Sequence, residues 1–198
     1  MDMRPLGLFG GTFDPVHYGH LRPAQEVLDA LSLDEIRFIP SALPPHRPAP
    51  VASAQQRLHM LQLAVAEFPR FSVDDREIRR GGPSYTVLTL ESLRAEEGDR
   101  PLCLVLGLDA FLGLETWHRW REIPDLAHLV VLTRPGWVLG KLPAWAGGRL
   151  GPPGDMALSP AGRLFFLAVK PQNISATGIR SALARGQSVE GLLPQAVQ

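Results

Sequence analysis

The residues with the clearest chemical potential lie in one stretch near the amino terminus, GGTFDPVHYGH at positions 10–20. Gly10 and Gly11 allow a ligand to approach the backbone closely, and their N–H groups can point at anionic oxygens. His17 and His20 are three residues apart, so they would share one face of a helical turn. Both neutral and protonated imidazoles can donate hydrogen bonds to phosphate oxygens. The stretch therefore predicts a phosphate site.

Other interpretations of this stretch have to be weighed. The sequence contains neither the G-x-x-x-x-G-K-[ST] of a P-loop nor the G-x-G-x-x-G of a dinucleotide-binding loop. The two histidines could instead hold zinc, but zinc would need a third ligand, and the other histidines are scattered singly. Asp14-Pro15 is a common turn pair, so a structural role for Asp14 is the simpler interpretation.

Length and composition predict a globular protein of one domain. The chain has 198 residues, of which 45 % are hydrophobic, enough to form a sizeable core. Twenty basic and 20 acidic residues give a net charge of zero, which argues against a general affinity for nucleic acids or acidic membranes. Cys103 is the sole cysteine, so an intrachain disulfide and a thiolate-rich metal site are excluded. The first residues do not resemble a signal peptide, and no apolar run approaches the roughly 20 residues that cross a bilayer, so a cytoplasmic location is expected.

Short apolar runs alternate with helical patterns along the whole chain. This alternation predicts an α/β fold, a Rossmann-like doubly wound domain whose mainly parallel sheet has helices on both faces. The helical pattern from Leu21 to Leu31 places Pro23 in a first turn, and Ser53 and Ser84 are candidate caps of two later helices. Strands are expected at 6–9, 35–40, 71–73, 101–107, 128–136 and 163–169, and helices at 21–31, at 54–67, after residue 84 and in the segment that ends before Gly186.

Residues 135–163 depart from this alternation. Seven glycines and five prolines fall within these 29 positions, too many for a core element. An irregular surface excursion is expected there, within one domain that spans residues 1–198.

Two further segments are expected near the phosphate site, because ligands of open parallel sheets bind past the carboxyl ends of the strands. Gly107 and Asp109 follow a buried strand, which suits a close backbone approach and a carboxylate for a ribose, although Asp109 could merely cap a helix. In ISATGIR at 174–180, Ser175 or Thr177 would open a helix whose free N–H groups face an anion. Arg180 would add a charge one turn later, and the alternative is an ordinary cap with an exposed arginine.

The H-x-G-H at 17–20 resembles the mark of a nucleotidyltransferase superfamily. PPHR at 44–47, GPSYT at 82–86, ISATGIR at 174–180 and GLDAFLGLETWHRW at 107–120 narrow the resemblance to the bacterial nicotinate-nucleotide adenylyltransferases. The resemblance extends over nearly the whole chain. It implies transfer of the adenylyl group of ATP to nicotinate mononucleotide, giving deamido-NAD and pyrophosphate in NAD biosynthesis. It also implies Mg²⁺ as a cofactor that accompanies ATP.

The same resemblance assigns roles to individual residues. The indole of Trp117 would stack on the pyridine ring, and the Thr86 hydroxyl would receive the nicotinate carboxylate. Trp120 is expected in the core, and no protein ligand of a metal is assigned. The implied catalytic residues are His17, His20, Arg47 and Arg180. The implied ATP-binding residues are Gly10, Gly11, Thr12, Gly107, Asp109, Ile174, Ser175 and Thr177, and those for nicotinate mononucleotide are Thr86, Trp117, His118 and Arg134.

Two other functions stay open at this point. One keeps the chemistry and changes the acceptor to nicotinamide mononucleotide or another phosphate. The other is a module that senses or binds ATP without turnover. Without the resemblance, Arg47 would be interpreted as a solvated loop cation, and the sequence leaves the oligomeric state open.

Overall fold

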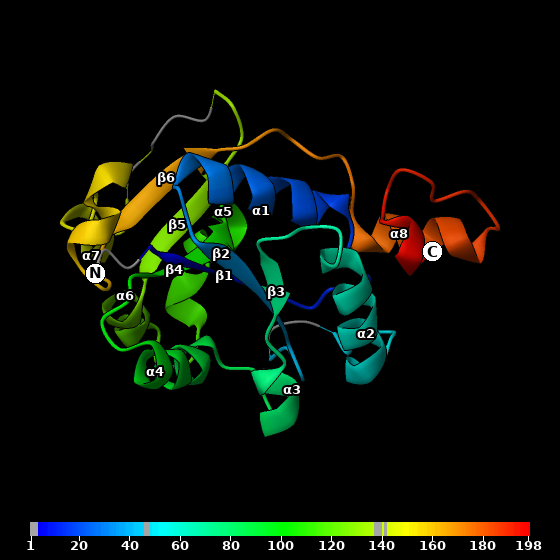
Figure 1. Cartoon of the computed structure of the whole chain (residues 1–198), viewed down its shortest axis with the longest axis horizontal. Coiled ribbons are helices and arrows are strands. Elements are labelled where there is room, and N and C mark those ends of the chain that lie inside the picture. Colours follow the sequence, from blue (N-terminus) through cyan, green and yellow to red (C-terminus); the bar gives the residue numbers. More distant parts are fainter. Residues whose placement is uncertain (1–3, 46–47, 137–139, 141) are drawn as a thin grey trace.

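The computed structural model describes residues 4–45, 48–136, 140 and 142–198 (Figure 1). Its six strands form a single sheet in the order β3-β2-β1-β4-β5-β6, and all five pairings between neighbours are parallel. This is the doubly wound order, in which the direction of strand addition reverses between β1 and β4. The strands are β1 (Leu6–Gly11), β2 (Glu35–Pro40), β3 (Phe71–Val73), β4 (Leu102–Gly107), β5 (His128–Thr133) and β6 (Leu164–Ala168).

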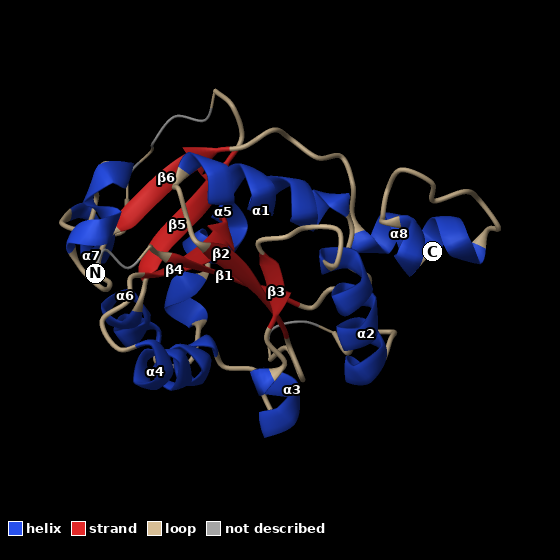
Figure 2. Cartoon of the chain, in the orientation of Figure 1, coloured by secondary structure: helices blue, strands red, loops and turns tan. Residues whose placement is uncertain are grey.

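Helices cover both faces of the sheet, as Figures 1 and 2 show. α1 and α2 pack on one face, and α4, α5, α6 and α7 pack on the other. The α-helices are α1 (Tyr18–Ala30), α2 (Ala54–Val65), α3 (Arg76–Arg80), α4 (Thr86–Glu97), α5 (Leu108–Leu112), α6 (Ile123–Leu126), α7 (Ala144–Gly147) and α8 (Ala176–Ala184). Short 3₁₀ turns are η1 (Leu114–Thr116), η2 (Trp120–Glu122), η3 (Pro153–Leu158) and η4 (Gln195–Val197).

Side chains of successive strand residues enter two separate cores. Cys103 and Val105 of β4 belong to the cluster under α1 and α2, whereas Leu104 and Leu106 belong to the cluster under α4. This division follows from the alternation of side chains along a strand, and burial on both faces explains why β4 reads as a continuous apolar run. The predicted fold class is confirmed.

α1 begins one turn earlier than its apolar pattern predicts. His17 precedes its first residue, and the His17 carbonyl accepts hydrogen bonds from the backbone N–H groups of His20 (2.8 Å) and Leu21 (3.2 Å). Pro23 is therefore the sixth residue of the helix and not a first-turn residue, so it has no N–H to donate to the Gly19 carbonyl. The early start places both histidines of the first loop at the helix terminus.

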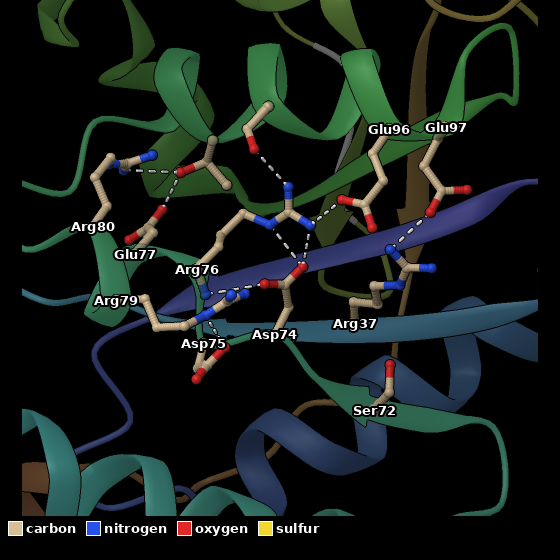
Figure 3. Close-up of polar contacts among 12 residues, drawn as sticks. Arg37, Ser72, Asp74, Asp75, Arg76, Glu77, Arg79, Arg80, Glu96 and Glu97 are labelled. Atoms are coloured by element: carbon tan, nitrogen blue, oxygen red, sulfur yellow. Dashed lines mark hydrogen bonds and ion pairs between the residues drawn. The ribbon is translucent and has the colours of Figure 1, made fainter.

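The segment between β3 and α4 contains a short helix that the sequence did not predict. Residues Arg76–Arg80 form α3, and Ser84 does not cap α4, because its hydroxyl oxygen instead accepts from the backbone N–H of Ala42 at 2.8 Å. Charged side chains brace α3 against α4 (Figure 3). The guanidinium of Arg76 lies 2.7 Å from carboxylate oxygens of both Asp74 and Glu96.

Part of the Gly/Pro-rich segment 135–163 packs inside the protein. Ala146 of α7 is fully buried in the core under α4, and Met156 of η3 is buried in the core under α1. The expectation of a surface excursion is therefore wrong for these residues. Short turns of helix, which glycine and proline tolerate at their ends, carry single apolar side chains into the cores.

His128 at the start of β5 is a buried histidine with a fixed hydrogen-bond pattern. Its Nδ1 accepts from the backbone N–H of Arg163 at 3.1 Å, and its Nε2 lies 2.8 Å from the Ser159 carbonyl oxygen. These two bonds require a neutral ring that carries its proton on Nε2. Burial lowers the pKa of His128, and the charges of Arg94 and Arg163 act in the same direction, against the backbone carbonyls of Ser159 and Met156.

The lowered pKa predicts how stability depends on pH. In the unfolded chain the pKa of histidine is about 6.5, so the contribution of neutral His128 is complete above this pH and is lost as the pH falls toward the folded-state value. Urea unfolding between pH 7.5 and 5 should therefore show a steeper loss of unfolding free energy in the wild type than in His128→Gln. Parallel curves would show that folding leaves the pKa of His128 at its unfolded-state value, which would contradict this account.

Candidate active site

Two glycines leave open space where the strand order reverses. Gly10 near the end of β1 and Gly107 at the end of β4 are exposed, and a Cβ at either position would meet no described atom within 4 Å. Both lie at the carboxyl edge of neighbouring strands. A ligand can therefore approach the backbone at this point of the sheet.

At the neighbouring position, Gly11, a larger residue is excluded by packing within the protein. A Cβ there would lie 2.8 Å from the ring of Phe13, which has a positive φ of 51°. Thr12 between them accepts a 2.6 Å hydrogen bond at its carbonyl oxygen from Arg57. Packing and hydrogen bonding thus fix the path of the first loop before any ligand is present.

His17 is held in a neutral state by its surroundings. Its side chain is buried, and its Nδ1 has no hydrogen-bond partner among the described residues. Burial lowers the pKa of His17 to about 4, because the charged ring would lose its hydration. At neutral pH the ring is therefore uncharged.

His20 lies against His17 with a defined tautomer. The backbone N–H of His17 donates to Nδ1 of His20 at 3.3 Å, so a neutral His20 carries its proton on Nε2. The two rings are stacked, with centroids 3.8 Å apart and an interplanar angle of 26°. Two positive charges at this distance would repel each other, so the arrangement disfavours the state in which both rings are protonated.

Gly19 brings the first loop into contact with the segment before α8. A Cβ at Gly19 would lie 2.8 Å from the His17 ring and 3.1 Å from the carbonyl oxygen of Ile174. The next residue, Ser175, caps α8 as predicted, because its hydroxyl oxygen accepts from the backbone N–H of Gly178 at 3.1 Å. The amino terminus of α8 thus lies beside the histidines.

Arg180 is fixed between α8 and the first loop. Its guanidinium donates to the Asp14 carbonyl oxygen at 2.6 Å and lies 3.3 Å from the hydroxyl of Thr177. The Asp14 carboxylate accepts from the backbone N–H groups of Val51 (2.8 Å) and Ala52 (3.0 Å). Asp14 therefore has the structural role that its turn pattern indicates.

The PPHR and GPSYT segments adjoin each other. Leu43 and Pro83 form an isolated parallel bridge, and the backbone N–H of Ser84 donates to the Leu43 carbonyl at 2.9 Å. Arg47, an expected catalytic residue, lies outside the described residues. Leu43, directly before PPHR, is nonetheless tied to the segment that leads into Thr86, the first residue of α4.

The expected pyridine-binding residues come together in part. The ring of Tyr85 lies 4.3 Å from the ring of His118, which joins the start of α4 to the turn after η1. Trp117 is half-buried and packs on the core under α4. Arg119 has a positive φ of 50° and forms an ion pair with Glu91 of α4 at 2.6 Å, which holds the same two elements together.

One expectation and one alternative about nearby side chains need correction. Trp120 does not belong to the core, because it is half-buried outside both clusters, 5.5 Å from the Trp145 ring and beneath Arg121. Asp109 is not a helix cap, since Gly107 precedes α5 and Asp109 is an exposed residue within its first turn. Arg134 directly follows β5 and is exposed at the same edge of the sheet.

Arg57 is a buried side chain of this region that the sequence did not single out. It lies on α2 and donates to the Thr12 carbonyl of the first loop. One signal was available: position 57 precedes Leu61 by one helical turn, so an arginine interrupts the apolar stripe of the helix.

Curated relatives match this chain over nearly its full length. A protein of Halorhodospira halophila named "Probable nicotinate-nucleotide adenylyltransferase" is 52 % identical over 201 residues, which cover 99 % of this chain and 92 % of the relative. A protein of Methylococcus capsulatus with the same name is 50 % identical over 197 residues, 97 % of this chain and 94 % of the relative. Residues 8–182 also match the family described as Cytidylyltransferase-like. The chain belongs to the nicotinate-nucleotide adenylyltransferase family.

Solved structures agree with the fold of this adenylyltransferase family. The Plasmodium falciparum nicotinic acid mononucleotide adenylyltransferase complexed with NaAD aligns with a TM-score of 0.73 over 98 % of this chain and 93 % of that chain, at 12 % identity. A putative nicotinate-nucleotide adenylyltransferase from Vibrio parahaemolyticus aligns with a TM-score of 0.66 over 98 % and 97 %, at 16 % identity. The resemblance drawn from the sequence is confirmed.

Neither a metal cluster nor a membrane helix accompanies this adenylyltransferase site in the described part of the chain. No three His, Cys, Asp or Glu side chains there are grouped so that they could hold a metal ion. Among the same residues, no helix has the length and apolarity to span a membrane.

The two kinds of glycine at the adenylyltransferase site predict different mutant phenotypes. Gly19→Ala should lower both the melting temperature and the turnover, because its methyl group would collide with the His17 ring and the Ile174 carbonyl, at a cost of about 1–3 kcal/mol. Gly10→Ala should leave the melting temperature nearly unchanged, because its methyl group meets no described atom of the protein. It should raise KM for ATP, because the methyl group occupies the space through which the ligand would approach the backbone. Thermal melts with steady-state kinetics test both. An unchanged KM in Gly10→Ala would remove Gly10 from the ligand-binding surface.

Proposed function

We propose that this chain transfers the adenylyl group of ATP to nicotinate mononucleotide, giving deamido-NAD and pyrophosphate in NAD biosynthesis. The observation that carries this is the 52 % identity, over nearly the whole chain, to a relative named nicotinate-nucleotide adenylyltransferase. The paired histidines at the open sheet edge support an enzyme and not a module that binds ATP without turnover.

The reaction needs little covalent work from the protein. An oxygen of the mononucleotide phosphate attacks the α-phosphorus of ATP, and the bond from that phosphorus to the β-phosphate oxygen breaks, so that pyrophosphate leaves. Both substrates are anions that have to be brought together in line. Positioning and neutralisation of charge therefore supply most of the acceleration.

In this proposal the two histidines donate hydrogen bonds to the phosphates undergoing transfer. The Nδ1 of His20 is occupied by the His17 backbone, so Nε2–H of His20 is the donor. Nδ1 of His17 is enclosed, which leaves Nε2 of that ring for a phosphate oxygen. The neutral ring of His17 donates without a prior change of protonation, so its alignment is complete before substrate binds.

Positive charge and the remaining ATP contacts come from the surrounding segments. Arg180 beside the first loop and the amino terminus of α8 face the same edge as the histidines, and Arg47 is assigned to the phosphates by its motif. The other residues assigned to ATP are Gly10, Gly11, Thr12, Gly107, Asp109, Ile174, Ser175 and Thr177.

The pyridine end is assigned to the start of α4 and the turn after η1. The Thr86 hydroxyl and nearby backbone N–H groups would receive the carboxylate, while Trp117 stacks on the ring. The contact between Tyr85 and His118 and the ion pair between Arg119 and Glu91 hold these two walls together. Arg134 at the end of β5 is assigned to the dinucleotide.

The family uses a divalent cation with ATP, and we infer Mg²⁺ in that role. The ion would neutralise charge on the triphosphate, and since it usually keeps several waters, nucleotide phosphates and water would hold it. A cytoplasmic location stays a prediction from the sequence.

The histidine roles predict a large loss of turnover without unfolding. His17→Ala and His20→Ala should each lower kcat by roughly 10² or more, because each removes a hydrogen bond to charge that develops in the transition state. His59→Ala is the matched control, since His59 is an exposed histidine on α2. Thermal melts verify folding, and turnover close to wild type in both variants would contradict the assignment.

The substrate assignment is tested by pyrophosphate release with ATP·Mg²⁺ and either nicotinate or nicotinamide mononucleotide. A site built for a carboxylate should prefer the acid strongly, because the amide leaves buried polar groups unpaired. Trp117→Ala should raise KM for the mononucleotide much more than KM for ATP, whereas Trp120→Ala, a half-buried tryptophan three residues away, should alter neither. Equal use of acid and amide would keep the reaction class and discard this pocket.

A further inference from the structure

Arg57 is the largest fully buried side chain of the described residues, with 1 % of its surface exposed. No carboxylate among these residues forms an ion pair with its guanidinium. Burial lowers the pKa of Arg57, and the charge of Asp14 partly opposes this effect. Burying a guanidinium costs free energy unless its N–H groups are hydrogen-bonded, so the partners of these groups determine how Arg57 is tolerated.

The guanidinium donates to four backbone carbonyls from three separate segments. It binds the Thr12 carbonyl of the first loop at 2.6 Å and the Ser41 and Ala42 carbonyls after β2 at 2.7 and 3.2 Å. Its Nε donates to the Ala52 carbonyl, just before α2, at 3.3 Å. One planar group therefore joins the end of β1, the end of β2 and the start of α2.

These contacts surround a functional segment. Ala42 and Ala52 lie on either side of the PPHR motif at 44–47, and Thr12 lies in the loop that leads to the histidines. Two further bonds follow the same path: the Ser41 backbone N–H donates to the Gly11 carbonyl at 2.9 Å, and the Asp14 carboxylate accepts from residues 51 and 52. Arg57 and Asp14 thus fix the first loop relative to residues 41–42 and 51–52, which lie on either side of the PPHR motif.

Arg94 provides an internal comparison. Its guanidinium also donates to four backbone carbonyls, those of Gly98, Arg100, Leu126 and Pro160. Burial likewise lowers its pKa. The last three of these carbonyls precede β4, β5 and β6. Arg94 therefore joins separate segments through backbone carbonyls as Arg57 does, but at the edge of the sheet opposite the site.

We propose that Arg57 is a positioning residue for adenylyl transfer, which holds the first loop in one arrangement relative to residues 41–42 and 52. This arrangement would let the phosphate contacts assigned to the two segments form together. This rests on the proposed function. It makes Arg57 more than a stabilising side chain, because an error of about 1 Å between two phosphate-contacting segments can cost roughly 10² in rate.

The test compares Arg57→Met, Arg57→Lys and Arg94→Met in the full chain. Thermal melts give the melting temperature of each variant. Well below that temperature, kcat and KM for each substrate are measured by kinetics and the Kd for ATP·Mg²⁺ by calorimetry, and all are corrected for the folded fraction. Arg94→Met should lose stability while kcat and Kd stay within about twofold of wild type. Arg57→Met should lose roughly 10² in kcat/KM for ATP and bind ATP·Mg²⁺ more weakly. Arg57→Lys should recover only part of both, because an ammonium cannot span four carbonyls as the planar fork does.

Equal behaviour of the Arg57 and Arg94 variants, with stability lost and both kinetics and ATP affinity retained, would overturn the proposal. If Arg57→Met does not fold, Arg57→Lys and Asp14→Asn carry the same comparison, since Asp14→Asn weakens the same junction without removing the guanidinium. A wild type that releases no pyrophosphate would contradict the proposed function instead. The ATP·Mg²⁺ affinities would then still decide whether Arg57 organises the phosphate site.

Discussion

The reversal of strand order between β1 and β4 is the constraint on which the rest of the site depends. Because every strand is parallel, the segments that follow β1, β2, β4, β5 and β6 all emerge at one edge of the sheet. At the reversal, the connections leave toward opposite faces, so no helix crosses the edge there and the backbone at Gly10 and Gly107 stays accessible. Several of the phosphate-binding candidates come from remote parts of the sequence, yet the parallel topology brings the strand ends that precede them to the same edge of the sheet.

In the proposed mechanism, the hydrogen-bond donors and the positive charges that contact the phosphates are different groups. Burial keeps His17 neutral, and the His17 backbone N–H accounts for one ring nitrogen of His20, so we propose that the two stacked rings act as aligned donors. In the same proposal the positive charge comes from Arg180 and from the amino terminus of α8, both of which lie beside the first loop. Two imidazolium rings 3.8 Å apart would repel each other, whereas a neutral His17 beside His20 avoids this repulsion.

What the sequence predicted, and what it missed, follows from the range of the interactions involved. The apolar runs of β2 and β4 and the Ser53 and Ser175 caps are local patterns, and the structure contains all of them. Ser84 is misassigned because a hydrogen bond from Ala42, 42 residues away in sequence, competes with capping. Trp120 was expected in the core, but which tryptophan packs inward depends on the left-handed turn at Arg119. Arg57 was not singled out from the sequence, because its partners are backbone carbonyls whose positions only the tertiary fold defines. The motif residues were found through family resemblance, because spacing alone does not reveal which loops meet.

The most direct test of this account is a crystal structure of the chain with deamido-NAD bound. We expect the bridging phosphates above Gly10 and Gly107, with Nε2 of His20 within hydrogen-bond distance of a phosphate oxygen and the pyridine ring against Trp117. The first loop and the residues flanking the PPHR motif should keep the arrangement that Arg57 imposes. Phosphates bound away from the two histidines, or a dinucleotide that leaves the β1–β4 edge empty, would contradict the central claim that the strand reversal creates the active site.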